Sequence, residues 1–529
     1  MTIYGHLTDP QMRDAADATD ETLRDDGARK TTSEPWLLRW PLDGRFARSE
    51  LDGRSVGPAH KGGAEGTRTP DPHTASVVRY QLRHSPLNRW SMVHGGGSGA
   101  DRWEGGGMFD PVAETMSADE RAAVQERRLR ALVDRLLAVG GLQADRLEDA
   151  GVTGGADVSL ADLPDLPTTR KQDLWDAYPF GMLAVPRDEI VAVHGSSGTG
   201  GRPTLVGYTR GDLELWAHVV ARALAAAGAT KSSTIQNAYG YGLFTGGVGV
   251  HQGGIALGAT VLPMSAGQTQ RQITMLRDLR PDLLTCTPSY AVHLGEALAG
   301  EPTTLTAGVL GAEPWSEALR RQIEDLLGIK ALDIYGLSEI IGPGVASECL
   351  EQSGLHVAED HFLVETLDPE GRPTADGQPG ELTFTTPTKE ALPLLRYRTG
   401  DVATLHRGRC ACGRTLARMS KVTGRVDDMI VVRGVNVYPS EIEAVLLAQP
   451  GVSPHYLVVV DRRTAATGLL VACETTAGTE RIEAGLRERL GIRVEVVGLP
   501  AGTIPRVEVG KARRRVDWTE GEPPLPGLR

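Results

Sequence analysis

A loop rich in glycines and hydroxyl groups, residues 194–204 with the sequence HGSSGTGGRPT, is the segment best suited to chemistry. It follows an apolar run, residues 189–193, that predicts a strand. Glycines let successive backbone N–H groups converge on one anion, and hydroxyl groups add uncharged donors. Arg202 adds a planar cation that matches phosphate oxygens. The loop therefore predicts a polyphosphate site, although it lacks the ending of the common P-loop and an ordinary surface turn can have this composition.

Carboxylates and one aromatic ring follow in two further motifs. In residues 333–339, DIYGLSE, Tyr335 can stack on a purine and Glu339 can hold Mg²⁺ on phosphate oxygens. This motif spans the end of a predicted strand, and ligands in α/β sheets collect beyond the carboxyl ends of strands. Residues 396–401, RYRTGD, end on Asp401, whose carboxylate can accept hydrogen bonds from two ribose hydroxyls. Each motif alone is also compatible with a solvated edge.

The elements that must position these motifs alternate between strand and helix patterns. Short β-rich runs are separated by segments with helical spacing, which predicts a parallel, layered α/β architecture. The predicted strands are residues 260–263, 283–286, 307–310 and 331–335, and the helices between them are residues 270–279 and 316–327. Before them, Ser117 and Glu120 form a capping signal for a helix that extends to Leu137.

Residues 1–107 differ in composition from the rest, and we expect them not to fold. They are rich in Gly, Arg, Asp, Pro and Ser, and they cannot bury enough apolar surface to offset the entropy of ordering. We interpret them as an extension upstream of a true start at Met108 or Met92, with a genuine disordered extension as the alternative. Tyr4 lies in a short segment that resembles the tail of tyrosine recombinases, but the rest of that catalytic core is missing, which disfavours a DNA-acting protein.

The remaining chain is long enough for two folded domains, residues 108–426 and residues 427–529. The second reads as a small α+β unit. Its predicted strands are residues 429–433, 455–460 and 468–474 with one final strand, and its predicted helices are residues 440–447 and 480–490.

Charge and composition exclude several classes of function. The net charge of −12 argues against a general nucleic-acid binder and against a basic membrane-surface patch. No apolar run is long enough to span a bilayer. The five cysteines are an odd number and widely spread, which predicts a reducing, cytoplasmic environment without a disulfide framework.

Taken in order, the motifs resemble those of the acyl- and aryl-adenylate-forming enzymes. The segments AYGYGLFTGG (238–247), PMSAGQT (263–269) and RGVNVYPS (433–440) are similar to the phenylacetate–coenzyme A ligase branch, and the likeness runs from about residue 108 to residue 518. The resemblance implies a large N-terminal domain of layered sheets and helices and a small mobile α+β C-terminal domain. It also implies an ATP-dependent aryl-acid–coenzyme A ligase, with phenylacetate as the first expected acid.

Two half-reactions follow from this resemblance. A carboxylate attacks the α-phosphorus of ATP and releases pyrophosphate, and the thiol of coenzyme A then displaces AMP to form a thioester. The first step is a displacement at phosphorus, in which the protein mainly positions groups and neutralises charge. Transfer of the acyl group to a carrier protein or an amine is the nearest alternative. A catalytically silent scaffold is disfavoured because Lys511, Glu339 and Asp401 are all present.

The resemblance also assigns roles by motif. The expected catalytic residues are Lys511 at the carboxylate and α-phosphate, Glu339 at Mg²⁺, and Arg425 near the ribose or phosphates. The expected ATP- and coenzyme A-binding residues are Ser196, Ser197, Gly198, Thr199, Arg202, Tyr335, Gly336, Ser338, Asp401 and Gly434. Asp427 matches the hinge position, which implies that the C-terminal domain rotates between half-reactions.

The expected acid-binding residues are Tyr239, Phe244, Gly311, Ala312, Ile334 and Pro343. Small residues at positions 311 and 312 leave room for a flat ring, on which Phe244 can pack. Core packing is the alternative for the two aromatic residues. No cation faces the end of the ring in this set, which favours a neutral aryl group, but the sequence does not decide which one.

A separate set, Cys349, His356, Cys410 and Cys412, suits a metal. Three thiolates and one imidazole make a tetrahedral shell for zinc, and some phenylacetate–coenzyme A ligases have a structural zinc at matching places. Buried thiols without a metal are the alternative. The expected cofactors are therefore ATP, Mg²⁺, coenzyme A and one structural Zn²⁺. The expected partners are a small aromatic acid and a second copy of the chain, with no nucleic acid and no membrane.

Overall fold

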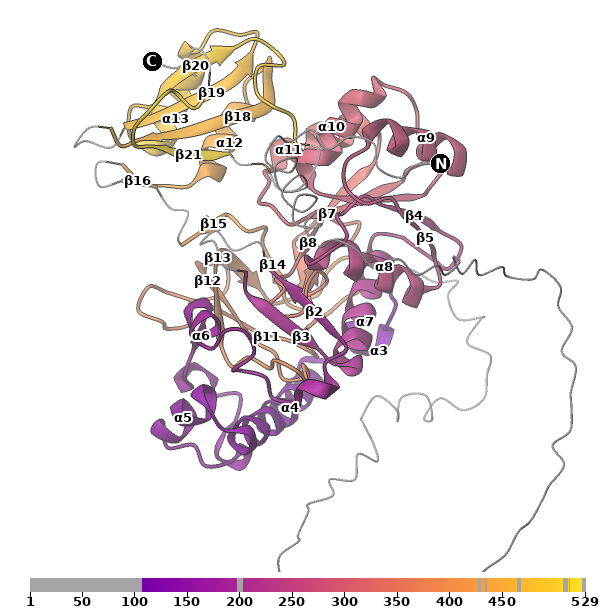
Figure 1. Cartoon of the computed structure of the whole chain (residues 1–529), viewed down its shortest axis with the longest axis vertical. Helices are drawn as coiled ribbons and strands as arrows, with labels where there is room; N and C mark the ends of the chain where they lie inside the picture. Colours follow the sequence, from indigo (N-terminus) through magenta and orange to yellow (C-terminus); the bar gives the residue numbers. More distant parts are fainter. Residues whose placement is uncertain are drawn as a thin grey trace, which may run out of the picture. The chain divides into compact units, whose positions relative to one another are not determined.

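The computed structural model describes residues 107–196, 203–426, 430–432, 435–463, 468–507, 512 and 514–525 (Figure 1). The chain divides into two units, residues 1–95 and 96–529, and the description below concerns the second. The predicted N-terminal extension, with Tyr4, lies outside the described residues. Within the described part, no helix combines the length and the apolar character needed to cross a bilayer.

Helices open the described chain. They are α3 (Pro111–Glu114), α4 (Ala118–Val139), α5 (Leu142–Asp149) and, after strand β1 (Thr169–Arg170), α6 (Lys171–Asp176). The predicted start of α4 is confirmed, because the Ser117 side chain accepts from Glu120 N and the Glu120 carboxylate accepts from Ser117 N. The apolar stripe of α4, with Leu132 and Leu136, is buried against α5 and against Leu363 and Leu395.

A hairpin of β2 (Ala192–Gly195) and β3 (Leu205–Tyr208) carries the glycine-rich loop. The predicted strand at residues 189–193 is placed too early, because residues 187–189 form a 3₁₀ turn, η4 (Arg187–Glu189). His194 and Gly195 belong to the strand instead of the loop, with Gly195 opposite Leu205. Residues 197–202 of the loop lie outside the described part.

Five parallel strands in the order β5-β4-β6-β7-β8 confirm the predicted α/β architecture. These strands are β4 (Thr234–Asn237), β5 (Thr260–Pro263), β6 (Leu283–Cys286), β7 (Ala307–Gly311) and β8 (Lys330–Tyr335). The helices between β3 and β8 are α7 (Arg210–Ala226), α8 (Thr245–Leu257), α9 (Thr269–Leu279), α10 (Pro288–Leu298) and α11 (Glu317–Leu327). Helices α10 and α11 pack against β7 and β8 (Figure 1). The parallel order brings the carboxyl ends of these strands to one edge.

Beyond β8 the same thirteen-stranded sheet continues in antiparallel pairs, apart from β1, which pairs with β13 in parallel. The added strands are β9 (Ala346–Ser347), β10 (Leu355–Val357), β11 (Leu363–Leu367), β12 (Pro379–Thr385), β13 (Tyr397–His406), β14 (Arg418–Met419) and β15 (Gly424–Arg425). No strand was predicted in this half, and its antiparallel pairing adds to the predicted parallel architecture. The connections from β8 to β9 and from β9 to β10 are short and contain no helix, so they cannot form the crossovers that parallel pairing requires.

Close packing of α7 on α8 explains the glycines of α8. A Cβ at Gly249 would lie 2.3 Å from the Trp216 ring, and one at Gly253 would lie 2.3 Å from the Val220 side chain. Trp216 and Val220 are fully buried, in the cluster that also holds Tyr208. The tight contact fixes the start of α8, which follows the predicted acid-binding segment 239–244.

The C-terminal part has its own core. Its elements are β16 (Ile430–Val432), β17 (Val435–Val437), α12 (Pro439–Leu447), β18 (Val452–Asp461), β19 (Gly468–Thr475), α13 (Glu480–Leu490), β20 (Glu495–Leu499) and β21 (Arg515–Trp518). Helices α12 and α13 bury Ile442 and Leu486 against β18 and β19 (Figure 1). The α+β character is confirmed, but two strands, β20 and β21, end the chain where we predicted one. The domain boundaries themselves stay predictions.

Candidate active site

Three predicted nucleotide-site residues lie in direct contact. Tyr335 ends β8, Asp401 lies in β13, and Arg425 lies opposite Asp401 in β15. The Tyr335 hydroxyl donates to Asp401 Oδ2 at 2.8 Å, and Arg425 Nη1 donates to Asp401 Oδ1 at 2.9 Å. Burial, reinforced by the Asp401 carboxylate, raises the pKa of Tyr335 well above its usual value. The structure thus joins residues that are far apart in the sequence into one polar cluster, with the Tyr335 ring stacked on Phe384.

Glu339 lies in a tight turn just after β8. Gly336 makes this turn possible, because a Cβ there would lie 1.7 Å from Gly342 O. The Glu339 side chain is buried, and its Oε1 lies 3.4 Å from Lys171 Nζ. The Ser338 hydroxyl lies 3.3 Å from the Thr245 hydroxyl. The turn is therefore held close to the start of α8 and the start of α6.

Two lysines near Glu339 were missed by sequence reasoning. Lys171 pairs with the Glu339 carboxylate, and Lys389 Nζ donates to Glu339 O at 2.8 Å. Neither lies in a glycine-rich or strand-terminal motif, so no local pattern separates them from surface lysines.

Only the first residue of the predicted phosphate-binding set can be placed. Ser196 N donates to Thr204 O at 3.0 Å, and the buried Ser196 hydroxyl has no hydrogen-bond partner among the described residues. A buried hydroxyl without a partner is suited to a ligand. Ser197, Gly198, Thr199 and Arg202 lie outside the described residues.

The predicted acid-binding residues cluster around the carboxyl ends of neighbouring strands. Tyr239 follows β4 and is buried, whereas Phe244 caps α8 with 53% of its surface exposed. Gly311 ends β7 opposite Ile334 of β8, and a Cβ at Gly311 would lie 2.2 Å from Ile334 O. Ala312, with a φ of +74°, directly follows β7. Pro343 lies in the segment after β8, and its carbonyl accepts from Trp216 Nε1 at 3.1 Å.

The segment 239–244, which holds the predicted acid-binding residues Tyr239 and Phe244, also contacts the hairpin of β2 and β3. Gly195 N donates to Leu243 O at 2.9 Å, and His194 Nδ1 lies 3.2 Å from the same oxygen. On the other side, Asn237 Nδ2 donates to the Tyr241 hydroxyl at 2.8 Å. Segment 239–244 is thus anchored at both ends, between the hairpin and the end of β4.

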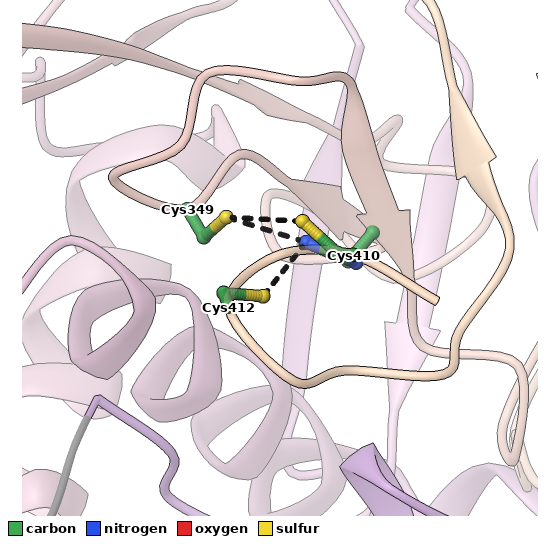
Figure 2. Close-up of side chains that lie close together, drawn as sticks. Cys349, Cys410 and Cys412 are labelled. Carbon is green, nitrogen blue, oxygen red and sulfur yellow. Dashed lines mark hydrogen bonds between the residues drawn. The ribbon is translucent and has the colours of Figure 1, made fainter. Parts of the chain in front are cut away.

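Three cysteines and one histidine form a separate cluster. Figure 2 shows the thiol groups of Cys349, Cys410 and Cys412 turned toward one another. Cys349 Sγ lies 3.9 Å from Cys410 Sγ and 3.4 Å from His356 Nε2, and Cys412 Sγ lies 3.5 Å from His356 Nε2. All four candidate ligand atoms lie within 4.8 Å of one another. The structure therefore brings together every residue of the predicted metal-binding set.

The surroundings of the thiols differ. Burial raises the pKa of Cys349 to about 12. Burial also acts to raise the pKa of Cys412, but hydrogen bonds from His356 and Arg414 outweigh it and lower that pKa to about 5. Arg414 Nη1 lies 3.5 Å from Cys412 Sγ and its Nε donates to Glu114 at 2.6 Å, so the cluster is linked to helix α3.

Three predicted residues of the C-terminal motifs fall in stretches that the structure does not describe. Lys511, Gly434 and the predicted hinge residue Asp427 all lie outside the described residues. Their predicted roles therefore rest on the motifs alone.

Comparisons with known proteins identify the family of the chain. Residues 111–389 match the AMP-binding enzyme family, and residues 434–518 match the AMP-binding enzyme C-terminal domain. These matches define the class as an adenylate-forming, AMP-binding enzyme. A crystal structure of a 2-hydroxyisobutyryl-CoA ligase in complex with R3-HIB-AMP is 28% identical with a TM-score of 0.73, over 80% of this chain and 94% of that one.

Two curated relatives narrow the class. A phenylacetate-coenzyme A ligase of Thermus thermophilus is 47% identical, over 78% of this chain and 99% of the relative. One of Escherichia coli K12 is 47% identical, over 77% of this chain and 97% of the relative. The chain belongs to the AMP-binding enzyme family, in its phenylacetate–coenzyme A ligase branch.

Proposed function

We propose that the protein joins phenylacetate to coenzyme A, with cleavage of ATP to AMP and pyrophosphate. The observation that carries this proposal is the 47% identity to two phenylacetate-coenzyme A ligases over nearly their whole length. The contact of Tyr335, Asp401 and Arg425 supports it, because it supplies a nucleotide-binding cluster at the carboxyl end of β8.

In the proposed first half-reaction, one oxygen of the acid attacks the α-phosphorus of ATP. The bond from that phosphorus to the bridging oxygen breaks, and pyrophosphate leaves. Tyr335 and Gly336 flank the adenine, while Asp401 accepts from the ribose hydroxyls. A carboxylate oxygen can accept more than one hydrogen bond, so the contacts with Tyr335 and Arg425 do not by themselves prevent this role.

Several groups of the protein neutralise the negative charge of the phosphates in this proposal. Ser196, Ser197, Gly198, Thr199 and Arg202 hold the β- and γ-phosphates, and Ser338 supports the turn beside them. Glu339 holds Mg²⁺, which neutralises charge on the phosphate oxygens when it is bound. Its carboxylate fits this role because it is buried next to Lys171 and is held by a turn of fixed geometry. Lys511 stabilises the negative charge that develops on the attacking and α-phosphate oxygens.

In the proposed second half-reaction, the coenzyme A thiol attacks the acyl carbonyl and AMP leaves. Rotation of the C-terminal domain, residues 427–529, about Asp427 against the N-terminal domain, residues 108–426, replaces Lys511 by the loop with Gly434. The absence of a side chain at Gly434 leaves room for the pantetheine chain. The acid itself binds among Tyr239, Phe244, Gly311, Ala312, Ile334 and Pro343, the group that gathers at the ends of β4, β7 and β8.

We also propose a structural zinc at Cys349, His356, Cys410 and Cys412. A tetrahedral shell with ordinary bond lengths separates two sulfurs by about 3.8 Å, and a sulfur from a nitrogen by about 3.5 Å. The observed separations, 3.9 Å between sulfurs and 3.4 and 3.5 Å between sulfur and nitrogen, match this shell. Four protein ligands leave no open position, so this metal has a structural role.

A pyrophosphate-exchange assay over a panel of aryl acids, followed by detection of the thioester, tests the proposed function. Phenylacetate should give the highest kcat/KM, and coenzyme A should convert the adenylate to a thioester. Exchange without thioester formation would instead indicate a carrier protein or an amine as the acceptor. Absence of exchange with every acid, in the presence of Mg²⁺, would reject the proposal.

A cytoplasmic location and a homodimer complete the proposal. All five cysteines are free thiols, which is consistent with a reducing compartment. Cell fractionation tests the location, and light scattering on the purified protein tests the dimer.

A further inference from the structure

Lys389 is a fully buried lysine that the proposed chemistry does not use. It lies between β12 and β13 and has 0% of its surface exposed. Burying an ammonium group is costly unless its charge and its protons are compensated. The reason that this position holds a lysine must therefore lie in what the ammonium contacts.

The ammonium contacts main chain and an aromatic face. Lys389 Nζ donates to Glu339 O at 2.8 Å and lies 5.2 Å from the centre of the Tyr208 ring. A cation over an aromatic face is stabilised by the ring quadrupole. Lys389 lies in the loop between β12 and β13. Its side chain thus links this loop to strand β3 and to the turn that carries Glu339.

Tyr208 holds the same turn from the same place. Its hydroxyl, fully buried, lies 3.1 Å from both Ser338 O and Ile341 O and donates to this pair. Within the turn, the N–H groups of residues 340, 341 and 342 all point to Leu337 O. The carbonyls of residues 338, 339 and 341 accept hydrogen bonds from side chains. Tyr208 donates to residues 338 and 341, and Lys389 donates to residue 339.

We propose that Lys389 is a positioning residue for adenylation, which acts with Tyr208 to hold the turn that presents the Glu339 carboxylate to the metal–ATP complex. Glu339 is fixed by Lys389 at its main chain and faces Lys171 with its side chain. Loss of the Lys389 contact frees the main chain of Glu339 and so misplaces its carboxylate. This inference rests on the proposed function.

Charged groups on four elements surround Lys389. Burial lowers its pKa to about 8, opposed by Asp212 on α7 and by Glu339. Arg135 of α4 donates to the Lys389 carbonyl at 2.7 Å, and the neighbouring Glu390 accepts from the Thr209 hydroxyl at 2.6 Å. The amine is protonated below pH 8 and neutral above it, so its hydrogen bond to Glu339 O weakens as the pH rises through about 8. Adenylation should fall over the same interval.

The test compares Lys389→Met with wild type in both half-reactions. We expect kcat/KM for MgATP in phenylacetate-dependent pyrophosphate exchange to fall about 100-fold, since a small misplacement can have this effect. Thiolysis of supplied phenylacetyl-adenylate should change less than about threefold, because it needs no metal-bound triphosphate. The Mg²⁺ concentration for half-maximal exchange should rise. In Lys389→Arg, which stays charged, the alkaline limb near pH 8 should disappear.

Arg320→Met is the matched control. Arg320 is also a buried cation that donates to a main-chain carbonyl, Ala331 O at 2.9 Å, at the far end of β8 from Tyr335. Arg320→Met should lower the Tm, but it should not lower pyrophosphate exchange more than thiolysis. If Lys389→Met keeps exchange within threefold of wild type, or loses both half-reactions equally, the inference is wrong.

Tyr208→Phe covers the case in which Lys389→Met does not fold. It removes only the hydroxyl oxygen that donates to the turn. Pyrophosphate exchange should fall about tenfold, while thiolysis of supplied phenylacetyl-adenylate should stay unchanged. An equal loss of exchange and thiolysis overturns the inference. Failure of the proposed function is distinct, because wild type itself would then show no exchange with phenylacetate.

Discussion

The nucleotide cluster and the cysteine–histidine cluster both gather residues from distant parts of the chain, but in opposite ways. Tyr335 and Arg425 both contact Asp401, and the Arg425 side chain stays partly exposed. The cysteine–histidine donor atoms instead all face one another within 4.8 Å. The first arrangement includes one partly exposed charged side chain, Arg425, and the second gathers its donor atoms around one point. The comparison teaches that substitutions in the first cluster should change rates, and those in the second should change stability.

The largest expected effect sharpens the first half of this comparison. Lys511→Ala should lower the rate of adenylation by roughly 1,000-fold or more. It removes the ammonium group proposed to stabilise the negative charge that develops on the α-phosphate oxygens. Thiolysis of supplied phenylacetyl-adenylate and the Tm should stay near wild type. Pyrophosphate exchange and thioester formation, measured separately, check this. An equal loss in both half-reactions would contradict the assigned role.

Asp401→Asn should lower kcat/KM for ATP by about 100-fold. The amide cannot accept as a charged group, and the ion pair between positions 401 and 425 is lost. Arg425 is partly exposed, so the Tm should change little. Exchange kinetics and thermal unfolding of the same sample test both statements. A large fall in Tm with an unchanged KM for ATP would break the comparison.

Replacing Gly434 with Leu should slow thiolysis by about tenfold, because a branched side chain would obstruct the pantetheine path. Pyrophosphate release in the first turnover should remain within twofold. Single-turnover measurements of the two steps distinguish these results. The reverse pattern would place this loop in the first half-reaction.

The smallest effect on rate should come from the second cluster. Cys412→Ser should remove the zinc and lower the Tm by about 5 °C or more, with kcat/KM changed less than about threefold. Elemental analysis and thermal unfolding are the measurements. Cys473→Ser, at a buried thiol of β19 outside the cluster, is the control and should keep the zinc. Wild-type protein with less than half an equivalent of zinc would refute the metal.

Local signals predicted the elements well. The strands at residues 260–263 and 283–286 and the helix at residues 480–490 have the predicted bounds, because each is defined by the spacing of its own apolar residues. The start of β2 was misplaced, since a 3₁₀ turn and an exposed strand share the same short apolar run. The parallel half of the sheet followed from alternation, but the antiparallel half depends on connection lengths that alternation does not reveal.

By itself the sequence determined the class of enzyme, through the order of its motifs, and the identity of the four candidate zinc ligands. Only the tertiary structure decided that Asp401 lies between Tyr335 and Arg425, and that Lys389 is buried beneath the Glu339 turn. The physical reason is the distance along the chain over which each signal acts. Backbone propensity and periodicity act over a few residues, whereas a buried lysine is distinguished from an exposed one only by the distant chain segments that enclose it.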